Sequence, residues 1–209
     1  FLHPGERAGG LGMLLARSRY LFIKEHRDRF GDKIFAELRG IIDEAGGSPF
    51  WDGLAGRFFG MSFQEADYFN AIHGNQFIAD LMPKHPIYTA MLSESARAAI
   101  GVPHPNGRAA MRMLENENFS YDGYVDIFDG GPTMIAKTDD VTSVRNAKSA
   151  RISALGKGDT KVIISHGKLS DFQATYAMLS EQDDGVMIDE QAAANIGLSV
   201  GDEIGYIPR

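Results

Sequence analysis

The residues best suited to binding a phosphorylated ligand form a glycine-rich turn near the start of the chain, Arg7-x-x-Gly10-x-Gly12. Leu11, Leu14, Leu15 and Phe22 recur on one helical face, so the turn leads into a helix. A helix start carries unpaired N–H groups and partial positive charge, and glycine lets a phosphate approach closely. The spacing is neither a phosphate loop nor a dinucleotide fingerprint. We therefore predict phosphate binding at this turn, with a purely structural turn as the alternative. The turn residues are Arg7, Ala8, Gly9, Gly10, Leu11 and Gly12.

Two histidines have positions that suit proton transfer, because histidine titrates near neutral pH. His104 lies between Pro103 and Pro105, which fix its backbone just ahead of a predicted helix. The structural alternative is that His104 only caps that helix. His85 precedes another proline and has Tyr88 three residues further on, an arrangement able to supply a base and an acid. For His85 we favour the alternative, a loop histidine bonded to the backbone. No two histidines show the i, i+4 spacing of metal ligands, so no metal site is predicted.

The elements that must position these residues follow from periodicity and turn signals. Ser62 and Glu65 form a capping box ahead of one helix, and Ser93 caps another. We interpret Phe50 and Trp51 as core residues rather than residues that stack on a cofactor. Residues 137–159 are polar and weakly patterned, which predicts a linker or a surface hairpin. Helices are predicted at 11–30, 49–59, 63–74, 93–101, 107–116, 171–179 and 190–196, and strands at 33–39, 121–128, 161–165, 186–188 and 203–207. This order predicts an α/β (α+β) fold with two domains, residues 1–133 and a small β-rich carboxy-terminal lobe at 134–209.

Composition excludes several classes of protein. The 209 residues carry a net charge of −7, which argues against broad nucleic-acid binding. No apolar run is long enough to cross a membrane, and no signal pattern is visible at the start. The absence of cysteine removes disulfides, thiolate metal sites and cysteine nucleophiles, and it fits a cytoplasmic location.

The turn resembles the pyrophosphate-binding turn of the GCN5-related N-acyltransferases, Arg/Gln-x-x-Gly-x-Gly/Ala. Further stretches resemble the arginine N-succinyltransferase family, in that family's order and over most of residues 1–133. The resemblance implies a mixed sheet flanked by helices. These stretches are Ala36-Glu37-Leu38-Arg39-Gly40, Ser48-Pro49-Phe50-Trp51, Phe77 to Tyr88, Val102-Pro103-His104-Pro105 and Asp126 to Thr133.

The resemblance implies a reaction in which succinyl-CoA donates its succinyl group to the α-amine of L-arginine. Coenzyme A would sit on the turn at residues 7–12, with no permanently bound cofactor. The family's proton donor matches His104, although Pro103 departs from the residue common before it. Family members also extend upstream of the position that matches Phe1. Since Phe1-Leu2 itself reads as a strand end, we expect an upstream segment to be missing.

Substrate arginine brings a guanidinium group, which pairs best with carboxylates. Glu37, Asp126 and Asp129 are the candidates for it, and Arg39 and Lys84 are candidates for the succinyl carboxylate. Turn or edge carboxylates are the structural alternative. The expected partners are the two small substrates and, in a homo-oligomer or with a related subunit, another chain. The alternatives in function are a different CoA-dependent amine N-acyltransferase, or a non-catalytic fragment or subunit of such an enzyme.

Overall fold

The computed structural model describes residues 3–6 and 8–209, and the chain forms two compact units. One unit combines Phe1–Asp32 with Lys137–Arg209, and the other is Lys33–Ala136. The predicted boundary after residue 133 lies close to the second junction between them. The predicted first domain also included residues 1–32, which here pack with the carboxy-terminal part of the chain. The predicted strand end at Phe1-Leu2 lies outside the described residues.

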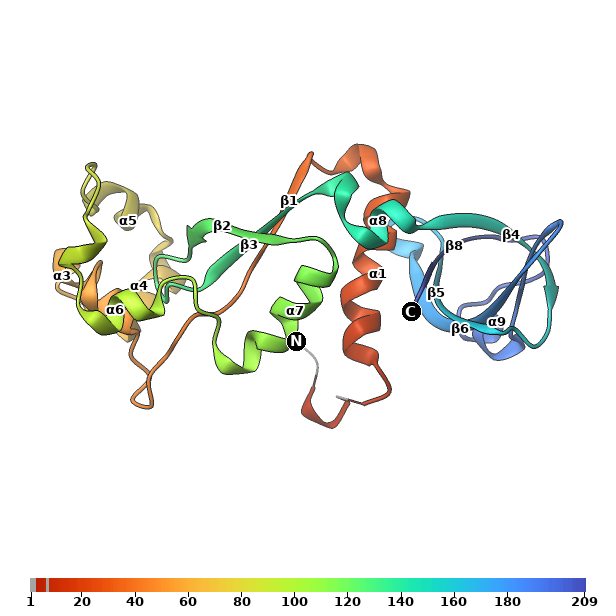
Figure 1. The fold of residues 1–209 in the computed structure, drawn as a ribbon, viewed down its shortest axis with the longest axis horizontal. Helices are drawn as coiled ribbons and strands as arrows, with labels where there is room; N and C mark the ends of the chain where they lie inside the picture. Colours follow the sequence, from red (N-terminus) through yellow and green to blue (C-terminus); the bar gives the residue numbers. More distant parts are fainter. Residues whose placement is uncertain (1–2, 7) are drawn as a thin grey trace. The chain divides into compact units, whose positions relative to one another are not determined.

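In the first unit, β4 to β8 close into a barrel with the order β4-β7-β6-β5-β8 (Figure 1). The pair β4 and β7 is parallel, and the other pairs are antiparallel. Alternate side chains point inward, so Val162, Ile164, Leu179 and Ile204 form a continuous buried core. The bounds are β4 (Lys148–Leu155), β5 (Thr160–His166), β6 (Gln173–Gln182), β7 (Gly185–Ile188) and β8 (Glu203–Pro208).

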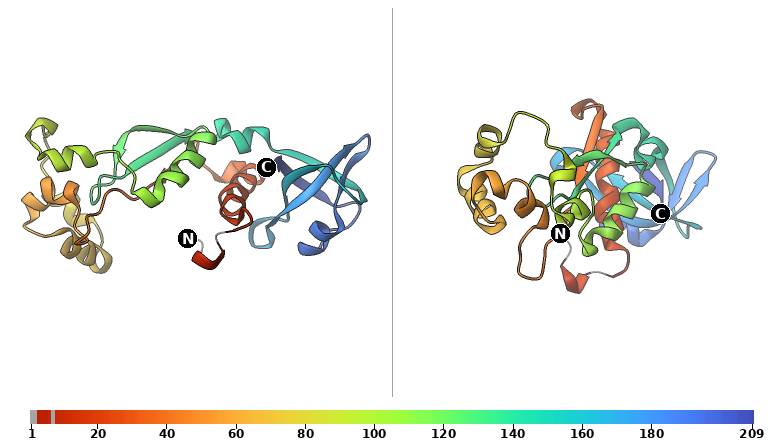
Figure 2. Two further views of the ribbon diagram at one scale, coloured as in Figure 1. Left: turned by 60° about the horizontal axis from the view of Figure 1, so that its bottom comes forward. Right: turned by 60° about the vertical axis from the view of Figure 1, so that its left-hand side comes forward.

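Helix α1 (Leu11–Glu25) runs along the outside of this barrel (Figures 1 and 2). Its Leu21 packs with Ile163 and Ile207, both of which are fully buried. Of the apolar face predicted from sequence spacing, Leu14 packs against this cluster, whereas Leu11 and Leu15 are 39% and 49% exposed, so the prediction is confirmed only in part. The unit also contains η1 (Pro4–Glu6), η2 (Arg27–Arg29), η5 (Thr138–Asp140), α8 (Thr142–Asn146), η6 (Leu169–Asp171) and α9 (Glu190–Asn195).

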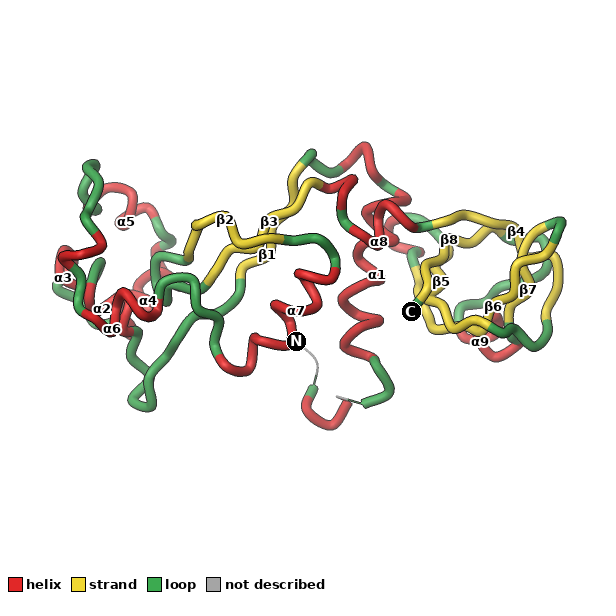
Figure 3. Tube along the Cα trace, in the orientation of Figure 1, coloured by secondary structure: helices red, strands yellow, loops and turns green. Residues whose placement is uncertain are grey.

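The second unit contains a sheet with the order β1-β3-β2, in which β2 and β3 are antiparallel. Short helices separated by loops make up most of the rest (Figure 3). The strands are β1 (Lys33–Glu37), β2 (Ser120–Val125) and β3 (Pro132–Lys137). The helices are α2 (Pro49–Gly53), α3 (Gly56–Phe59), α4 (Phe63–His73), α5 (Gln76–Leu81), η3 (Thr89–Met91), α6 (Glu94–Ala99), η4 (Pro105–Gly107) and α7 (Arg108–Asn116).

An aromatic stack centres the core of the second unit. The Trp51 ring is fully buried and stacks on Phe59 and Phe128, with ring centroids 5.5 and 5.1 Å away. Its indole N–H donates to the Met61 carbonyl at 2.9 Å, so the polar edge of the ring is satisfied as well. The interpretation of Phe50 and Trp51 as core residues is confirmed, with Phe50 4% exposed.

Some predicted elements are confirmed and others are wrong. The Ser62 capping box and the Ser93 cap begin α4 and α6 as predicted. The predicted helix at 171–179 is instead part of strand β6, which pairs along its length with β5 and β7. The segment 137–159, predicted as a linker or hairpin, contains η5, α8 and β4. In both segments the residues have weak periodicity, and pairing with distant strands decides their structure. Within the described residues, no helix is both long and apolar enough to span a membrane.

Candidate active site

The glycine-rich turn ends in a left-handed residue that begins α1. Gly10 has φ 86° and ψ 12°, a conformation that side chains with a Cβ rarely adopt. Its carbonyl accepts from the N–H groups of Met13 and Leu14, at 2.9 and 3.1 Å. The N–H of Leu11 donates to the Ala8 carbonyl at 3.2 Å, which tightens the turn. Arg7 lies outside the described residues, so this geometry concerns Ala8 to Gly12 alone.

Two residues from the barrel and its end, Tyr176 and Arg209, reach this turn, and neither was predicted to do so. The Tyr176 hydroxyl of β6 donates to the Gly10 carbonyl at 2.6 Å. The Arg209 guanidinium lies 5.1 Å from the Tyr176 ring centroid. One of its nitrogens lies 2.5 Å from where a Cβ on Gly10 would stand. Sequence reasoning missed Tyr176 because it assigned that segment to a helix.

The predicted proton donor His104 is held by its own backbone. Its N–H donates to the Arg39 carbonyl at 2.7 Å, beyond the end of β1. Its Nδ1 accepts from the Asn106 N–H at 3.2 Å and caps η4. With Nδ1 accepting, the neutral ring carries its proton on Nε2. The cap that was predicted for the helix at 107–116 is found on η4 instead, because Gly107 is the N-cap of α7. The bond to Nδ1 fixes the tautomer that leaves Nε2–H as a donor.

A cavity of about 450 Å³ collects all four carboxy- and guanidinium-bearing residues that were predicted to bind substrate. Glu37 and Arg39 come from the end of β1, and Asp126 and Asp129 come from the turn between β2 and β3. Asp67 of α4 adds a fourth carboxylate that sequence reasoning missed. Its only signal was the capping box, which places Phe63 and Asp67 four residues apart on one helical face. The walls are completed by Leu38, Phe63 and Phe128.

The α4 wall of this cavity is fixed at its start by the capping box. The Ser62 N–H donates to the Glu65 carboxylate at 2.8 Å, and the Ser62 hydroxyl donates to the same oxygen at 2.9 Å. The backbone bond, followed by the hydroxyl bond, holds the pKa of Glu65 below its ordinary value. Glu65 therefore stays ionised at neutral pH and keeps the first turn of α4 in place.

Both aspartates of the turn also serve the backbone, as their structural alternative predicted. Asp126 Oδ1 accepts from the Phe128 N–H at 2.8 Å and from the Asp129 N–H at 3.3 Å. Asp129 Oδ1 accepts from the Gly131 N–H at 2.9 Å. One oxygen of each carboxylate thus accepts hydrogen bonds from the backbone of the turn, and this fixes the direction of the other oxygen.

Two glycines let the chain segments of this site meet backbone to backbone. The Leu38 N–H donates to the Pro132 carbonyl at 3.1 Å. A Cβ on Gly40 would overlap the Asp129 carbonyl, and one on Gly131 would overlap the Leu38 carbonyl. His104 is not among the residues that line this acidic cavity, but its backbone N–H is bonded to the carbonyl of Arg39, which is one of them.

The rival histidine is in a different setting. His85 is exposed, and it lines neither the acidic cavity nor the other described cavities. Tyr88 is 78% exposed. Lys84, the second candidate for the succinyl carboxylate, donates to the Ala79 carbonyl at 3.4 Å. The structure does not bring these three residues together with the four predicted substrate residues.

Comparison with known proteins places these features in a family. Residues 1–143 match the family described as arginine N-succinyltransferase beta subunit, and residues 145–208 match its C-terminal domain. Arginine N-succinyltransferase subunit beta of Pseudomonas aeruginosa is 43% identical over all of this chain and 62% of its own length. Arginine N-succinyltransferase of an Enterobacter species is 50% identical over 73% of this chain and 44% of its own length.

A solved structure is also similar over the whole chain. Arginine/ornithine succinyltransferase subunit AI from Pseudomonas aeruginosa has a TM-score of 0.86 and 28% sequence identity. The match covers 100% of this chain and 60% of the other protein. The chain thus spans less than two thirds of the length of these relatives.

Proposed function

We propose that this chain, which belongs to the arginine N-succinyltransferase beta subunit family, transfers succinyl from succinyl-CoA to the α-amine of L-arginine. The observation that carries the proposal is the acidic cavity. It gathers four carboxylates and one guanidinium, and it is bonded through Arg39 to the predicted proton donor. A cationic substrate with a reactive amine suits this arrangement.

In this proposal the acidic cavity binds the guanidinium of arginine. Glu37 and Asp67 are exposed carboxylates on opposite elements, able to accept paired N–H bonds. Asp129 and Asp126 add negative charge from the turn. Arg39 binds a carboxylate, which we assign to the succinyl group. The relative described as an arginine/ornithine succinyltransferase makes ornithine the second amine to test.

The turn at residues 7–12 binds the pyrophosphate of CoA in this proposal. The start of α1 supplies the positive end of a 15-residue helix dipole. Gly9 and Gly10, both with positive φ, leave no side chain between the ligand and the backbone. Arg7 is assigned to the same phosphates.

His104 acts as the hydrogen-bond donor to the leaving group, the role in which we place the predicted proton donor. The neutral amine nitrogen attacks the thioester carbonyl carbon and forms a C–N bond, and the C–S bond then breaks. The nitrogen loses a proton to solvent and the CoA sulfur takes one from solvent, while Nε2–H of His104 donates a hydrogen bond that stabilises the departing thiolate. The bond from the Asn106 N–H to Nδ1 keeps the donating proton on Nε2. His85 is the alternative donor.

Three further features belong to the same proposal. The proposed architecture is that of the GCN5-related acyltransferases, which the glycine-rich turn leading into α1 supports. A protein without cysteine and with net charge −7 fits the cytoplasm and small-molecule substrates rather than nucleic acid. The name subunit beta of the Pseudomonas relative supports assembly with a second copy or a related subunit.

A thiol-release assay on the full-length protein tests the proposal. Succinyl-CoA is paired with arginine and with ornithine, and acetyl-CoA replaces succinyl-CoA as a control. We expect arginine-dependent release that falls at least about a hundredfold in His104→Ala. Release with no pair of substrates would overturn the proposed activity. Full activity of His104→Ala, together with loss in His85→Ala, would move the donor role to His85.

A further inference from the structure

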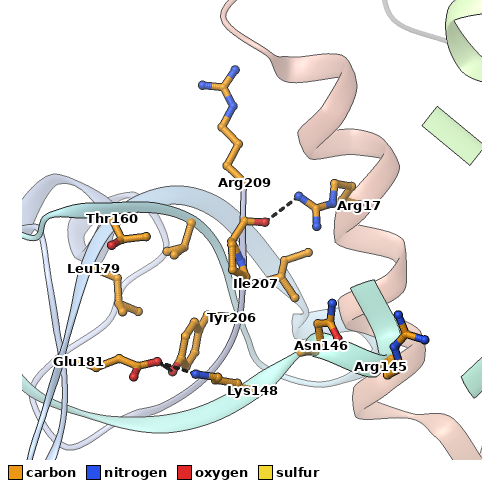
Figure 4. A pocket seen from close by; sticks show the side chains of 13 residues that line it. Arg17, Arg145, Asn146, Lys148, Thr160, Leu179, Glu181, Tyr206, Ile207 and Arg209 are labelled. Carbon is orange, nitrogen blue, oxygen red and sulfur yellow. Dashed lines mark hydrogen bonds and ion pairs between the residues drawn. The ribbon is translucent and has the colours of Figure 1, made fainter. Parts of the chain in front are cut away.

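A second cavity, of about 710 Å³, lies in the first unit and has no part in the function proposed above. It opens between α1, α8 and the barrel, and its volume is in the range of small-ligand sites. Figure 4 shows basic side chains around it from four elements. These are Arg17 of α1, Arg145 of α8, Lys148 of β4 and Arg209 after β8.

The carboxylate that lines this cavity already has two hydrogen-bond partners. Glu181 is the acidic residue among the lining residues. It accepts from Lys148 Nζ and from the Tyr206 hydroxyl, each at 2.8 Å (Figure 4). The Lys148 bond, followed by the Tyr206 bond, holds the pKa of Glu181 below its ordinary value. Among the described residues, neither Arg145 nor Arg209 forms an ion pair. The cavity therefore has excess positive charge in a chain whose net charge is −7.

One edge of the cavity meets the turn at the start of α1. Arg209 lines the cavity, and its guanidinium also lies against Gly10. Tyr176 links the two, because its hydroxyl bonds to the Gly10 carbonyl while its ring faces Arg209. The ammonium of Lys161 lies 5.0 Å from the same ring. Positive charge is thus continuous from the turn to the cavity.

The spacing along α1 suggests what anion the cavity takes. Arg17 follows Leu11 by six residues, about 9 Å along the helix axis. In CoA one ribose separates the pyrophosphate from the 3′-phosphate, which is a distance of the same order. The apolar walls include Pro208 and Leu179, and Tyr206 adds a ring. A nucleotide end with a phosphate and a base matches both the charge and the walls.

We propose that this cavity binds the 3′-phosphoadenosine end of the acyl-CoA, with Arg145 and Arg209 as phosphate-binding residues. The inference rests on the proposed function, because it takes the pyrophosphate to lie on the turn. It gives the carboxy-terminal barrel a direct part in binding a substrate. Arg17, whose guanidinium donates to Ser143 Oγ and the Pro208 carbonyl at 3.0 and 2.7 Å, holds α1 on the barrel beside the ligand.

The test compares succinyl-CoA with 3′-dephospho-succinyl-CoA in the protein as its own gene encodes it. In Arg145→Ala and Arg209→Ala we expect KM for succinyl-CoA to rise about tenfold. In Arg145→Ala, KM for arginine, kcat and KM for the dephospho compound stay at wild-type values. In Arg209→Ala, KM for the dephospho compound rises less than KM for succinyl-CoA, because Arg209 also lies against the turn. The matched control is Arg19→Ala, an exposed arginine on α1 that bonds the Ala16 carbonyl of its own helix and lines no described cavity.

Two outcomes would overturn the inference. One is an equal rise in KM for both acyl-CoA compounds, and the other is no rise for either. Failure of the proposed function looks different, because wild-type protein would then release no thiol at all. In that case calorimetry with adenosine 3′,5′-bisphosphate and with adenosine 5′-monophosphate still tests the cavity. Tighter binding of the bisphosphate, lost in Arg145→Ala, supports the inference, whereas equal binding of the two nucleotides overturns it.

Discussion

The cavity beside the barrel and the cavity at the end of β1 have linings of opposite charge. The first has basic side chains from α1, α8, β4 and the residue after β8 around Glu181, whose carboxylate is bonded to Lys148. The second has four carboxylates around one arginine. Acyl-CoA is an anion and arginine carries a cationic side chain. The difference teaches that each unit can select one substrate of the proposed reaction by charge alone.

The two cavities are also held in different ways. The basic cavity rests on a closed barrel whose apolar core is continuous, so its walls are rigid strands. The acidic cavity rests on loops whose backbones approach closely at Gly40 and Gly131 and are joined by the bond from the Leu38 N–H to the Pro132 carbonyl. A single added methyl group at one of these glycines should therefore disturb the acidic cavity far more than any surface change disturbs the barrel.

The largest effect is expected from Gly131→Ala. The new Cβ would overlap the Leu38 carbonyl, and backbone atoms cannot move aside as a flexible side chain can. We expect the free energy of unfolding of the second unit to fall by about 3 kcal/mol, and arginine-dependent activity to be lost. Denaturant unfolding followed by Trp51 fluorescence measures the change, because Trp51 is the single tryptophan and lies in that unit.

Gly107→Ala is the matched control for this glycine. Gly107 has φ −89°, and a Cβ there would meet only Pro103 Cβ, at 3.9 Å. Its unfolding should stay within about 1 kcal/mol of wild type. Equal stability of the two variants would show that the close approach at Gly131 does not hold the acidic cavity together. Binding of adenosine 3′,5′-bisphosphate to the barrel should survive in both.

A smaller effect is expected from Asp67→Asn, which removes charge from the acidic cavity and keeps the shape of the side chain. KM for arginine should rise about tenfold, because a charge-assisted bond to the guanidinium is lost. KM for succinyl-CoA should not change. This is the mirror image of the expected effect of Arg145→Ala. The control is Asp122→Asn on β2, an exposed aspartate that does not line the cavity. Equal effects on both KM values would break the charge comparison.

The sequence allowed the parts of both sites to be predicted where a local signal exists. The capping box at Ser62, the cap at Ser93 and the buried Trp51 follow from residue types within a few positions, and all three are confirmed. The four substrate candidates gather in one cavity, although their roles stay predictions. Resemblance to a family supplied the order in which these segments occur.

The missed residues depend on pairing between distant segments. Tyr176 lies in a stretch rich in good helix formers, Ala-Met-Leu-Ser-Glu, that pairing with β5 turns into a strand. Arg209 reaches Gly10 only because the closed barrel brings β8 beside β5 and α1. Asp67 could be recognised as a cavity residue only once α4 was placed against the turn at Asp126. No periodicity in the sequence carries such contacts.

Tyr176→Phe should have a smaller effect again. It removes the hydroxyl bond to the Gly10 carbonyl and keeps the ring that faces Arg209. A single neutral hydrogen bond is worth about 1 kcal/mol, so KM for succinyl-CoA should rise roughly fivefold at most. KM for arginine should be unchanged. Tyr124→Phe, at a 65% exposed position on β2, is the control. A larger change than that of Arg209→Ala would mean that the turn depends on Tyr176 more than on the guanidinium.

The smallest effect is the change in stability at alkaline pH that comes from Tyr206, which is bonded to Glu181 in the basic cavity. Burial, followed by the bond to Glu181, raises the pKa of Tyr206 to about 12. Since an unfolded tyrosine titrates near 10, this contribution to stability is fully present below about pH 10. It is lost as the pH rises through the folded-state pKa of about 12.

Tyr206→Phe should remove this pH dependence. Lysines also lose charge in that range, so the measurement is the difference in unfolding free energy between wild type and variant across it. A difference that does not vary with pH would mean that folding does not raise the pKa of the Tyr206 hydroxyl.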